Sequence, residues 1–415
     1  MKRTGYYKFI ALLLLFVLVT STFAFVACNP NSAEPSDDTQ DGKHEHTFSK
    51  IWSQDEEYHW NVATCEHKNL IQHKAKHTFE GNVCSVCQYD KSNEIFVPND
   101  GYVLSDDGKY VYFGYYPQSV VSDTTIIAAL NAKTKGLPTR DSKLWTDYGY
   151  YMDGKQQSFM WYIDVVHNKE KYRGVYFTYC RPVWASDVNT QTDIHGFAVN
   201  TVHWFKFEQI KWRILSQSDG AALLMCDSVL DSQAYQIDYY YENGQYLTSF
   251  NGAPEGTSAF NYKYSGVRHW LNNDFYNTAF SDTSKMLILT TEVDNGENSV
   301  MQEDNPYLCE NTFDKVFLLS RQDLQNVDYG FYESMYFDDV ARRLKVSAYA
   351  LAQGAKMIDG DRICGVWWLR SPYVQNFDKG ISQIDYRGYF IDCAMHFETS
   401  IGVVPALRIQ LHSAE

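Results

Sequence analysis

The residues best suited to metal or thiol chemistry gather in residues 44–91. Six of the twelve histidines lie between His44 and His77, and three of the nine cysteines lie among or just after them. Cys84-Ser-Val-Cys87 has the spacing at which two thiolates bind one tetrahedral zinc ion, and histidine is the usual partner ligand. The pattern therefore predicts a closed, structural zinc site with ligands from this set: Cys65, either His67 or His77, Cys84 and Cys87.

Residues 44–91 also admit a disulfide between Cys84 and Cys87, with the histidines solvated. A module of about 50 residues builds too small a hydrophobic core to be stable alone, so either a metal or a disulfide is expected to stabilise it. His46-Thr-Phe48 is repeated as His77-Thr-Phe79. The repeat predicts two related halves around one site.

Cys28 is a second candidate for chemistry, because of the residues that precede it. Basic residues at the start are followed by an apolar run from Phe9 to Phe25 and then by Phe25-Val-Ala-Cys28. This arrangement is typical of a signal peptide, here residues 1–27. The run has about 17 residues, close to the lower limit for crossing a bilayer, so a retained anchor helix is the alternative. The last four residues resemble the bacterial lipobox, although Phe25 stands where Leu is usual, and this resemblance implies acylation of Cys28.

Composition separates a tether from a folded part. Residues 28–43 are polar, with Asn, Ser, Asp, Pro and Gly and no apolar periodicity, so we expect them to stay unfolded. The whole chain is 45% hydrophobic and 16% aromatic, which is enough for a sizeable core. Its net charge is −15 and it has no basic stripe, so nucleic acid is an unsuitable partner.

Residues 95–412 read as one large domain of mixed strands and helices. A strand is expected at 110–113, and a hairpin at 211–215 and 221–225 around the turn at 218–220. Helices are expected at 265–280, with Ser265 as N-cap, and at 339–354, ended by Gly354. Further strands are expected at 367–369 and 403–409. Because no βαβ rhythm appears, we expect an α+β fold with antiparallel sheets.

Several motifs in this domain resemble a known bacterial family. Gly114-Tyr-Tyr-Pro-Gln118, Lys211-Trp-Arg-Ile-Leu215, Trp367-Trp-Leu-Arg-Ser-Pro372 and Gly402-Val-Val-Pro-Ala-Leu407 resemble, in order, a family of secreted proteins known only as a domain of unknown function. Residues 44–91 likewise resemble His- and Cys-rich modules of surface lipoproteins from anaerobic bacteria. The C-terminal pattern is similar to formylglycine-generating enzymes and C-type-lectin-like domains, which implies a lectin-like fold for residues 95–412.

The lectin-like resemblance also implies a ligand face. In such relatives the loops before the last strand bind the ligand, which here corresponds to residues 373–399. The exposed candidates on this face are Tyr373, Gln375, Asn376, Asp378, Tyr386, Arg387, Tyr389 and His396. Trp270-Leu-Asn-Asn-Asp274 also invites a calcium-lectin interpretation, but its helical spacing argues against it.

The sequence favours binding over catalysis. It has no G-x-S-x-G, no H-E-x-x-H and no Gly-rich phosphate loop. Formylglycine chemistry needs two nearby cysteines, whereas Cys364 and Cys393 are 29 residues apart. Tyrosine clusters such as Tyr148-Gly-Tyr-Tyr151 suit a sugar or a protein partner. We therefore expect a lipid-anchored binding or adhesion protein outside the cytoplasm. The alternatives are an extracellular enzyme and a structural envelope protein without a ligand.

Overall fold

The chain folds into two compact units, residues Met1–Ala75 and Lys76–Glu415, in the computed structural model. The division falls inside the predicted module of residues 44–91, whose bounds stay a prediction, as do the other predicted domain bounds. The residues that the structure describes are 45–65, 67, 69–139, 143–148, 150–152, 155–157, 160–178, 195–335, 337–357, 364–375, 378–398 and 400–411.

The first unit is built on a small sheet. Strands β1 (Ser53–Gln54), β2 (Tyr58–Val62) and β3 (Ile71–Lys76) are neighbours in that order, and β1 pairs antiparallel with β2. The buried positions of β2 are polar, His59 and Asn61. The ring of His59 meets Trp52 edge-on at 4.7 Å, and Asn61 is hydrogen-bonded to His73 at 2.9 Å. This unit therefore has few aliphatic side chains in its centre.

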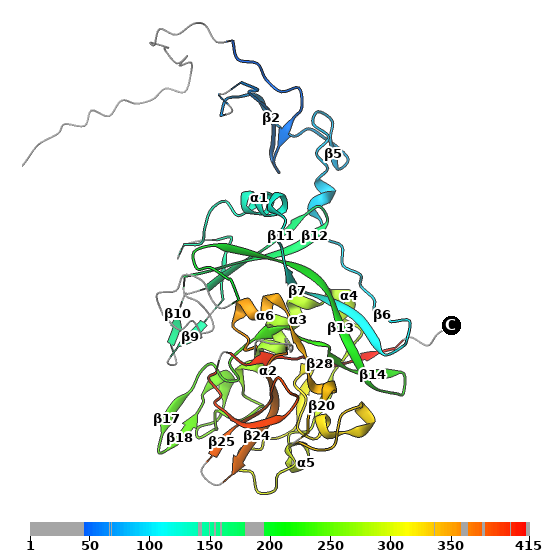
Figure 1. The fold of residues 1–415 in the computed structure, drawn as a ribbon, viewed down its shortest axis with the longest axis vertical. Helices are drawn as coiled ribbons and strands as arrows, with labels where there is room; N and C mark the ends of the chain where they lie inside the picture. The colour runs from blue at the N-terminus through cyan, green and yellow to red at the C-terminus, as the bar shows by residue number, and fades with distance from the viewer. Residues whose placement is uncertain are drawn as a thin grey trace, which may run out of the picture. The chain divides into compact units, whose positions relative to one another are not determined.

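The second unit begins with a short hairpin and then builds a ten-stranded sheet. The hairpin is β4 (Phe79–Glu80) and β5 (Val83–Cys84), followed by the 3₁₀ turn η1 (Lys91–Glu94). The sheet runs β19-β28-β14-β13-β12-β11-β8, with β7 and then β6 added to β13, and β22 added to β28 (Figure 1). Its strands are β6 Val103–Leu104, β7 Tyr110–Val120, β8 Thr146–Asp147, β11 Met160–His167, β12 Glu170–Phe177, β13 Val202–Ser218, β14 Ala221–Cys226, β19 Ile288–Leu289, β22 Val316–Phe317 and β28 Ala406–Gln410.

A second sheet carries the C-terminal motifs. Its order is β16-β27-β24-β25-β26, with β24 and β27 parallel and the hairpin β24–β25 antiparallel. Its strands are β16 Asp231–Ser232, β24 Trp367–Gln375, β25 Asp378–Ile384, β26 Phe390–Ala394 and β27 Gly402–Val403. Two-stranded pairs complete the set: β9 Tyr150–Met152 with β10 Lys155–Gln157, β15 Ser228–Val229 with β23 Lys345–Val346, β17 Tyr240–Glu242 with β18 Gln245–Leu247, and β20 Thr291–Val293 with β21 Thr312–Asp314.

The helices are short. Helix α6 contacts both β7 of the main sheet and β16 of the second sheet, and α3 also contacts β7. The helices are α1 Thr124–Lys133, α2 Gly266–Trp270, the π-helical turn η3 Leu271–Phe275, α3 Tyr276–Ala279, α4 Asp282–Lys285, α5 Glu297–Val300 and α6 Ala348–Gln353. The remaining 3₁₀ turns are η2 Phe250–Gly252, η4 Asp323–Gln325, η5 Val327–Tyr329 and η6 Val340–Arg342.

The α+β class with antiparallel sheets is confirmed, and most expected elements are present. The strand at Tyr110 lengthens into β7, and the hairpin is β13–β14, with Asp219 and Gly220 at positive φ in its turn. The helix after Ser265 is continuous through α2, η3 and α3, and the Ser265 hydroxyl accepts the N–H of Arg268 at 3.2 Å.

The predicted helix at 339–354 is wrong over its first half. Residues 340–342 form a 3₁₀ turn and residues 345–346 a strand, and helix α6 begins only after Ser347. The cause lies at Arg342, whose buried guanidinium donates to the carbonyls of Leu324, Tyr332 and Ser334. These hydrogen bonds favour the observed turn over the helix that the spacing of the apolar side chains predicted. Gly354 does end α6, with a φ of 104°.

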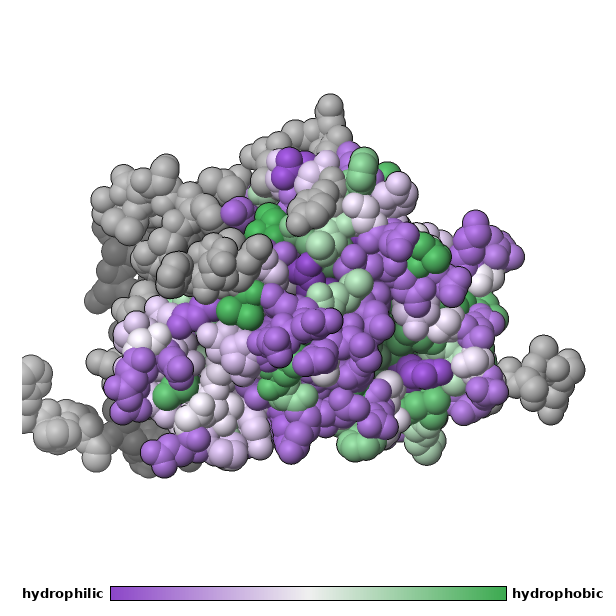
Figure 2. All heavy atoms as spheres, turned by 90° about the horizontal axis from the view of Figure 1, so that it is seen from below, coloured by the Kyte–Doolittle hydropathy of each residue, from purple (hydrophilic) through white to green (hydrophobic). Residues whose placement is uncertain are grey.

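The core of this domain is apolar and its surface is mostly hydrophilic. A large cluster of buried side chains includes Trp212, Trp367 and Trp368, all fully buried. The face seen in Figure 2 is mostly hydrophilic, and its hydrophobic residues are scattered in small groups. Among the described residues, none of the helices combines the length and the apolar composition needed to span a bilayer.

Candidate functional site

Three of the predicted metal ligands meet at the start of the second unit. Cys84 ends strand β5, the turn Cys84-Ser-Val-Cys87 carries the second thiol back toward it, and His77 lies just before β4. The ligand atoms of these three side chains lie within 4.8 Å of one another, and Cys87 Sγ is 3.3 Å from His77 Nδ1. Tetrahedral zinc with Zn–S near 2.3 Å and Zn–N near 2.0 Å places its ligand atoms about 3.5 Å apart. The group can therefore hold a metal ion.

The electrostatics of Cys84 favour metal binding. Burial alone would raise the pKa of Cys84, but backbone N–H groups of Cys87 and Val86 and the His77 ring outweigh it and lower the pKa to about 5. The pKa of Cys87 is raised, first by burial and then by the neighbouring Cys84 thiol. The two sulfurs are not joined in a disulfide. Cys84 is thus a thiolate at neutral pH, the form in which cysteine binds metals.

The first unit holds a second His/Cys group. Cys65 Sγ lies 3.5 Å from His46 Nδ1 and 3.9 Å from His67 Nδ1, and the two histidine rings meet edge-on at 5.0 Å. This group is more exposed than the first. His46 was not among the predicted ligands, although the repeated His-Thr-Phe motif pointed to it. Each copy of that motif supplies one histidine, His46 to the first unit's group and His77 to the second unit's group. The single site predicted between the two halves stays a prediction.

The predicted ligand face near the C-terminus is split between exposed and half-buried positions. Tyr373 is half-buried in β24 with its ring 5.5 Å from the Arg321 guanidinium. Arg387 is exposed, pairs with Asp385 at 2.9 Å and lies over the rings of Tyr386 and Tyr389. Cys28 and Asn376 lie outside the described residues, and of Gln375 and Asp378 only the backbone, paired across the β24–β25 turn, is described.

His396 is not an exposed ligand residue, which corrects the prediction. Its side chain is fully buried, with Tyr239, Tyr246 and Phe260 around it at ring distances of 4.6 to 5.2 Å. Burial lowers its pKa to about 3. The loop sequence gave no sign of this, because Tyr239, Tyr246 and Phe260 come from more than 100 positions earlier in the chain.

A polar and aromatic cavity of about 430 Å³ opens at the helix that follows Ser265. We call it the Trp270 cavity. One wall is a face of this helix, with Trp270, Asn273, Asp274, Asn277 and Thr278. The other walls are Tyr116, Thr146, Asp147, Tyr148, Tyr162, Arg173 and Gln233.

A buried carboxylate, Asp231, is hydrogen-bonded to three of the residues that line the Trp270 cavity: Tyr116, Tyr148 and Gln233. Asp231 is fully buried and accepts hydrogen bonds from Tyr116 Oη at 2.5 Å, Tyr148 Oη at 3.2 Å, Gln233 Nε2 at 3.2 Å and the Ser232 N–H at 2.6 Å. Burial raises its pKa to about 6 despite these donors. Each donor fixes the position of a side chain that lines or underlies the cavity.

The Arg173 guanidinium in the cavity wall is held by an ion pair with Asp164, a carboxylate that also pairs with Lys171 at 3.3 Å. The guanidinium forms a two-point pair with Asp164, at 2.7 and 2.9 Å, and donates to the Tyr349 hydroxyl at 3.3 Å. The guanidinium also lies 4.3 Å from the centre of the Tyr162 ring. Arg173 therefore holds the aromatic wall in place, and two carboxylates also line the cavity, those of half-buried Asp147 and exposed Asp274.

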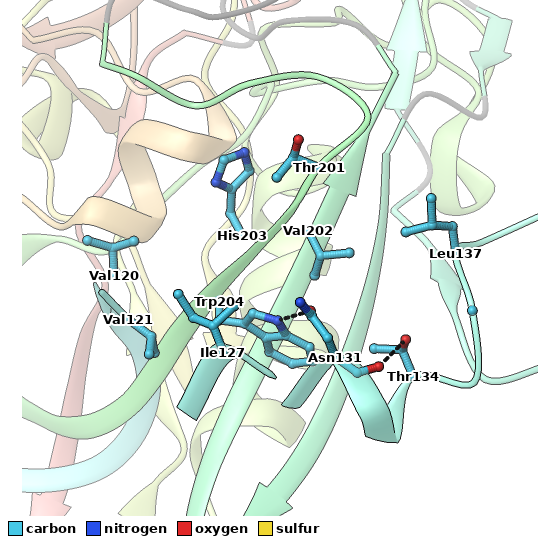
Figure 3. A pocket seen from close by; sticks show the side chains of 11 residues that line it. Val120, Val121, Ile127, Asn131, Thr134, Leu137, Thr201, Val202, His203 and Trp204 are labelled. Carbon is cyan, nitrogen blue, oxygen red and sulfur yellow. Dashed lines mark hydrogen bonds between the residues drawn. The ribbon is translucent and has the colours of Figure 1, made fainter. Parts of the chain in front are cut away.

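A second cavity, of about 530 Å³, lies between α1 and strand β13 (Figure 3). Most of its walls are aliphatic, from Val120, Ile127, Leu137 and Val202 among others. Its main polar groups are already satisfied, because Asn131 accepts the indole N–H of Trp204 at 2.8 Å (Figure 3). It offers an apolar ligand shape but few directed polar contacts.

Comparison with known proteins assigns part of this chain to a family. Residues 219–411 match a domain of unknown function (DUF6273), a range that includes the motifs at 367–372 and 402–407 but not those at 114–118 and 211–215. No curated protein and no solved structure matches the chain. The family match covers Asp231, Gln233 and the helix at 265–280, and it assigns them no role.

Proposed function

We propose that this protein is a lipid-anchored, extracytoplasmic binding protein, and that its main domain takes a carbohydrate or protein ligand. One observation carries the proposal: the Trp270 cavity has aromatic and amide walls, and residues that line it are already held by hydrogen bonds and an ion pair. A site whose side chains are fixed before binding loses little conformational entropy on binding. Its volume falls within the roughly 300–1,000 Å³ range of small-molecule sites.

Cys28 supplies the anchor in this proposal. The basic start, the apolar run and Phe25-Val-Ala-Cys28 support acylation, and residues 28–43 then give a polar tether about 16 residues long. Several acyl chains, as the lipobox resemblance implies, hold a protein firmly where a single chain holds it only marginally. The lectin-like fold remains part of the same proposal, whereas the ligand face expected at residues 373–399 is the alternative location for the ligand.

Zinc is the metal we assign to His77, Cys84 and Cys87. Two thiolates with an imidazole suit zinc better than the oxygen-seeking ions calcium and magnesium. A bound zinc would stabilise the hairpin β4–β5, whose two strands have two residues each and little core of their own. Its role here is structural, and substituting the remaining histidines of residues 44–91 in turn would identify any further ligand.

A binding screen tests the proposed function. The chain without residues 1–27, purified with zinc, is applied to a glycan array, to mucins and to extracted surface proteins. Saturable binding to at least one of these supports the proposal. Blank results across all three, with protein shown to be folded by circular dichroism, would overturn it.

A further inference from the structure

We propose that the Trp270 cavity is the ligand site and that it takes a neutral carbohydrate ring. The inference rests on the proposed binding function and gives that function a place and a ligand class. It also moves the site away from the predicted face at residues 373–399.

The helix after Ser265 presents two opposite faces. Val267, Leu271 and Phe275 are fully buried in the core. Trp270, Asn273, Asp274, Asn277 and Thr278 follow at i, i+3, i+4, i+7 and i+8, which is one helical face, and all five line the cavity. The face that points away from the core thus combines one large aromatic ring with four polar side chains.

The middle of this helix is a π-helical turn, at Leu271–Phe275. Such turns are rare and occur often at functional sites, because the extra residue re-aims the side chains around it. Asn273 and Asp274 lie within the turn. In the part of the chain that the structure describes, the exposed side chains of Asp274 and Asn277 have no hydrogen-bond partner, so both can serve a ligand.

Aromatic rings supply the surface that a sugar ring needs. Trp270 is half-buried and packs on Phe275 at 5.6 Å, so its position is held from below. Tyr148 and Tyr162 meet edge-on at 5.9 Å across the cavity wall. The C–H faces of a sugar ring pack against such aromatic faces, while its hydroxyls bond to amides and carboxylates.

Charge selects among carbohydrates. Arg173 is paired with Asp164, whereas Asp147 and Asp274 line the cavity. An anionic sugar would meet these two carboxylates, while the Arg173 guanidinium is already engaged by Asp164 and Tyr349, so sialylated and sulfated glycans are disfavoured. The amide and hydroxyl groups of Asn273, Asn277 and Thr278 favour a ligand with many hydroxyls over a simple organic cation.

Calorimetric titration tests the inference with the zinc-loaded chain lacking residues 1–27. The probes are lactose, cellobiose and diacetylchitobiose as neutral sugars, sialyllactose as the anionic one, and choline as the cation. We expect at least one neutral sugar to bind, and its sialylated form to bind more weakly. Trp270→Ala should weaken that binding about tenfold, as expected for loss of one aromatic contact, while Trp270→Phe should restore most of it.

Two variants complete the design. Asn277→Ala should weaken sugar binding severalfold, and Asn298→Ala, an exposed asparagine in helix α5 outside the cavity, should leave it unchanged. Unaltered sugar binding in Trp270→Ala and Asn277→Ala would overturn the inference while leaving the proposed binding function standing. Preferential binding of sialyllactose or of choline would also overturn it. Binding to no sugar, with binding to a protein in the wider screen, would overturn the inference alone.

Discussion

The hydroxyl of Tyr116, a residue that lines the Trp270 cavity, lies 2.5 Å from Oδ2 of Asp231, and both side chains are buried. A carboxylate in that position is costly unless donors surround it. Tyr116, Tyr148, Gln233 and a backbone N–H supply them. The pair joins β7 of the main sheet to β16 of the second sheet, so it ties the cavity wall to both sheets.

Replacing Tyr116 by Phe should destabilise the domain. A hydrogen bond to a charged group contributes about 1.5–3 kcal/mol, whereas one to a neutral carbonyl contributes about 0.5–1.5 kcal/mol. Tyr235 gives the matched control, because its buried hydroxyl donates to the Arg370 carbonyl. Urea unfolding at pH 7.5 should show a larger loss for Tyr116→Phe than for Tyr235→Phe, and the reverse order would contradict the arrangement described.

Asp231 should make stability fall as pH rises between pH 4 and 6. Its pKa is about 6 in the folded chain against an ordinary value of 3.8, so folding favours the protonated form. Its stabilising contribution is complete below pH 3.8 and is lost as pH rises through 6, by about 3 kcal/mol in all. Asp231→Asn removes the titration. The difference in unfolding free energy between wild type and Asp231→Asn should shift in the variant's favour from pH 4 to pH 7, and a constant difference would contradict the prediction.

His396 should make the stability of the domain fall as pH decreases, the opposite of the effect of Asp231. Its pKa is about 3 in the folded chain against an ordinary value of 6.5, so the stability that its neutral ring contributes is complete above pH 6.5. That stability is lost as pH falls from 6.5 toward 3, by about 2 kcal/mol at pH 5. The groups that face the ring are Tyr239, Tyr246, Phe260 and Phe397, none of which titrates in this window.

His396→Phe provides the comparison for this second titration. Relative to wild type, the variant should gain stability as the solution is taken from pH 7 to pH 5 in urea titrations. Parallel stability curves for the two proteins would mean that His396 is hydrated or paired in the folded chain.

Zinc binding should depend on the thiols of Cys84 and Cys87. We expect Cys84→Ser to lower bound zinc by one equivalent per chain, because two thiolates contribute most of the affinity of such a site. Cys309→Ser, a half-buried cysteine elsewhere in the domain, should retain zinc fully. Plasma emission analysis of the purified proteins gives the count. An unchanged zinc content in Cys84→Ser would contradict the assignment, as would a Cys84–Cys87 disulfide in unreduced wild type. The zinc content of Cys65→Ser would show whether Cys65 shares the site.

Cys28 should decide whether the protein stays with membranes. Wild type expressed in a bacterial host should partition into the detergent phase on Triton X-114 separation, and Cys28→Ala should move to the aqueous phase. Retention of the variant in the membrane would mean that the apolar run before Cys28 stays as an anchoring helix.

Local signals in the sequence were sufficient for local structure. Ser265 caps its helix, and Asp219-Gly220 forms the hairpin turn, because each depends on a few adjacent residues. Arg342 shows where this fails: its carbonyl partners lie 8 to 18 residues earlier in the chain, outside the predicted helix, and they override the helical pattern around it.

The sites followed the same rule. Cys84 and Cys87 could be predicted as metal ligands, because the Cys-x-x-Cys spacing itself indicates such a site. Asp231 was not, since Tyr116 and Tyr148 lie 115 and 83 residues away from it in sequence. The helix that carries Trp270 was predicted, but its polar face with Asn273, Asp274 and Asn277 was not, and only the fold shows that a cavity lies in front of that face.

Hydrogen–deuterium exchange with and without the tightest-binding neutral sugar tests the central claim most directly. A ligand in the Trp270 cavity should slow exchange in peptides covering residues 146–148 and 270–278, and leave residues 385–389 unchanged. Slower exchange confined to residues 373–398, with the helix after Ser265 unaffected, would contradict the account and return the ligand to the C-terminal face.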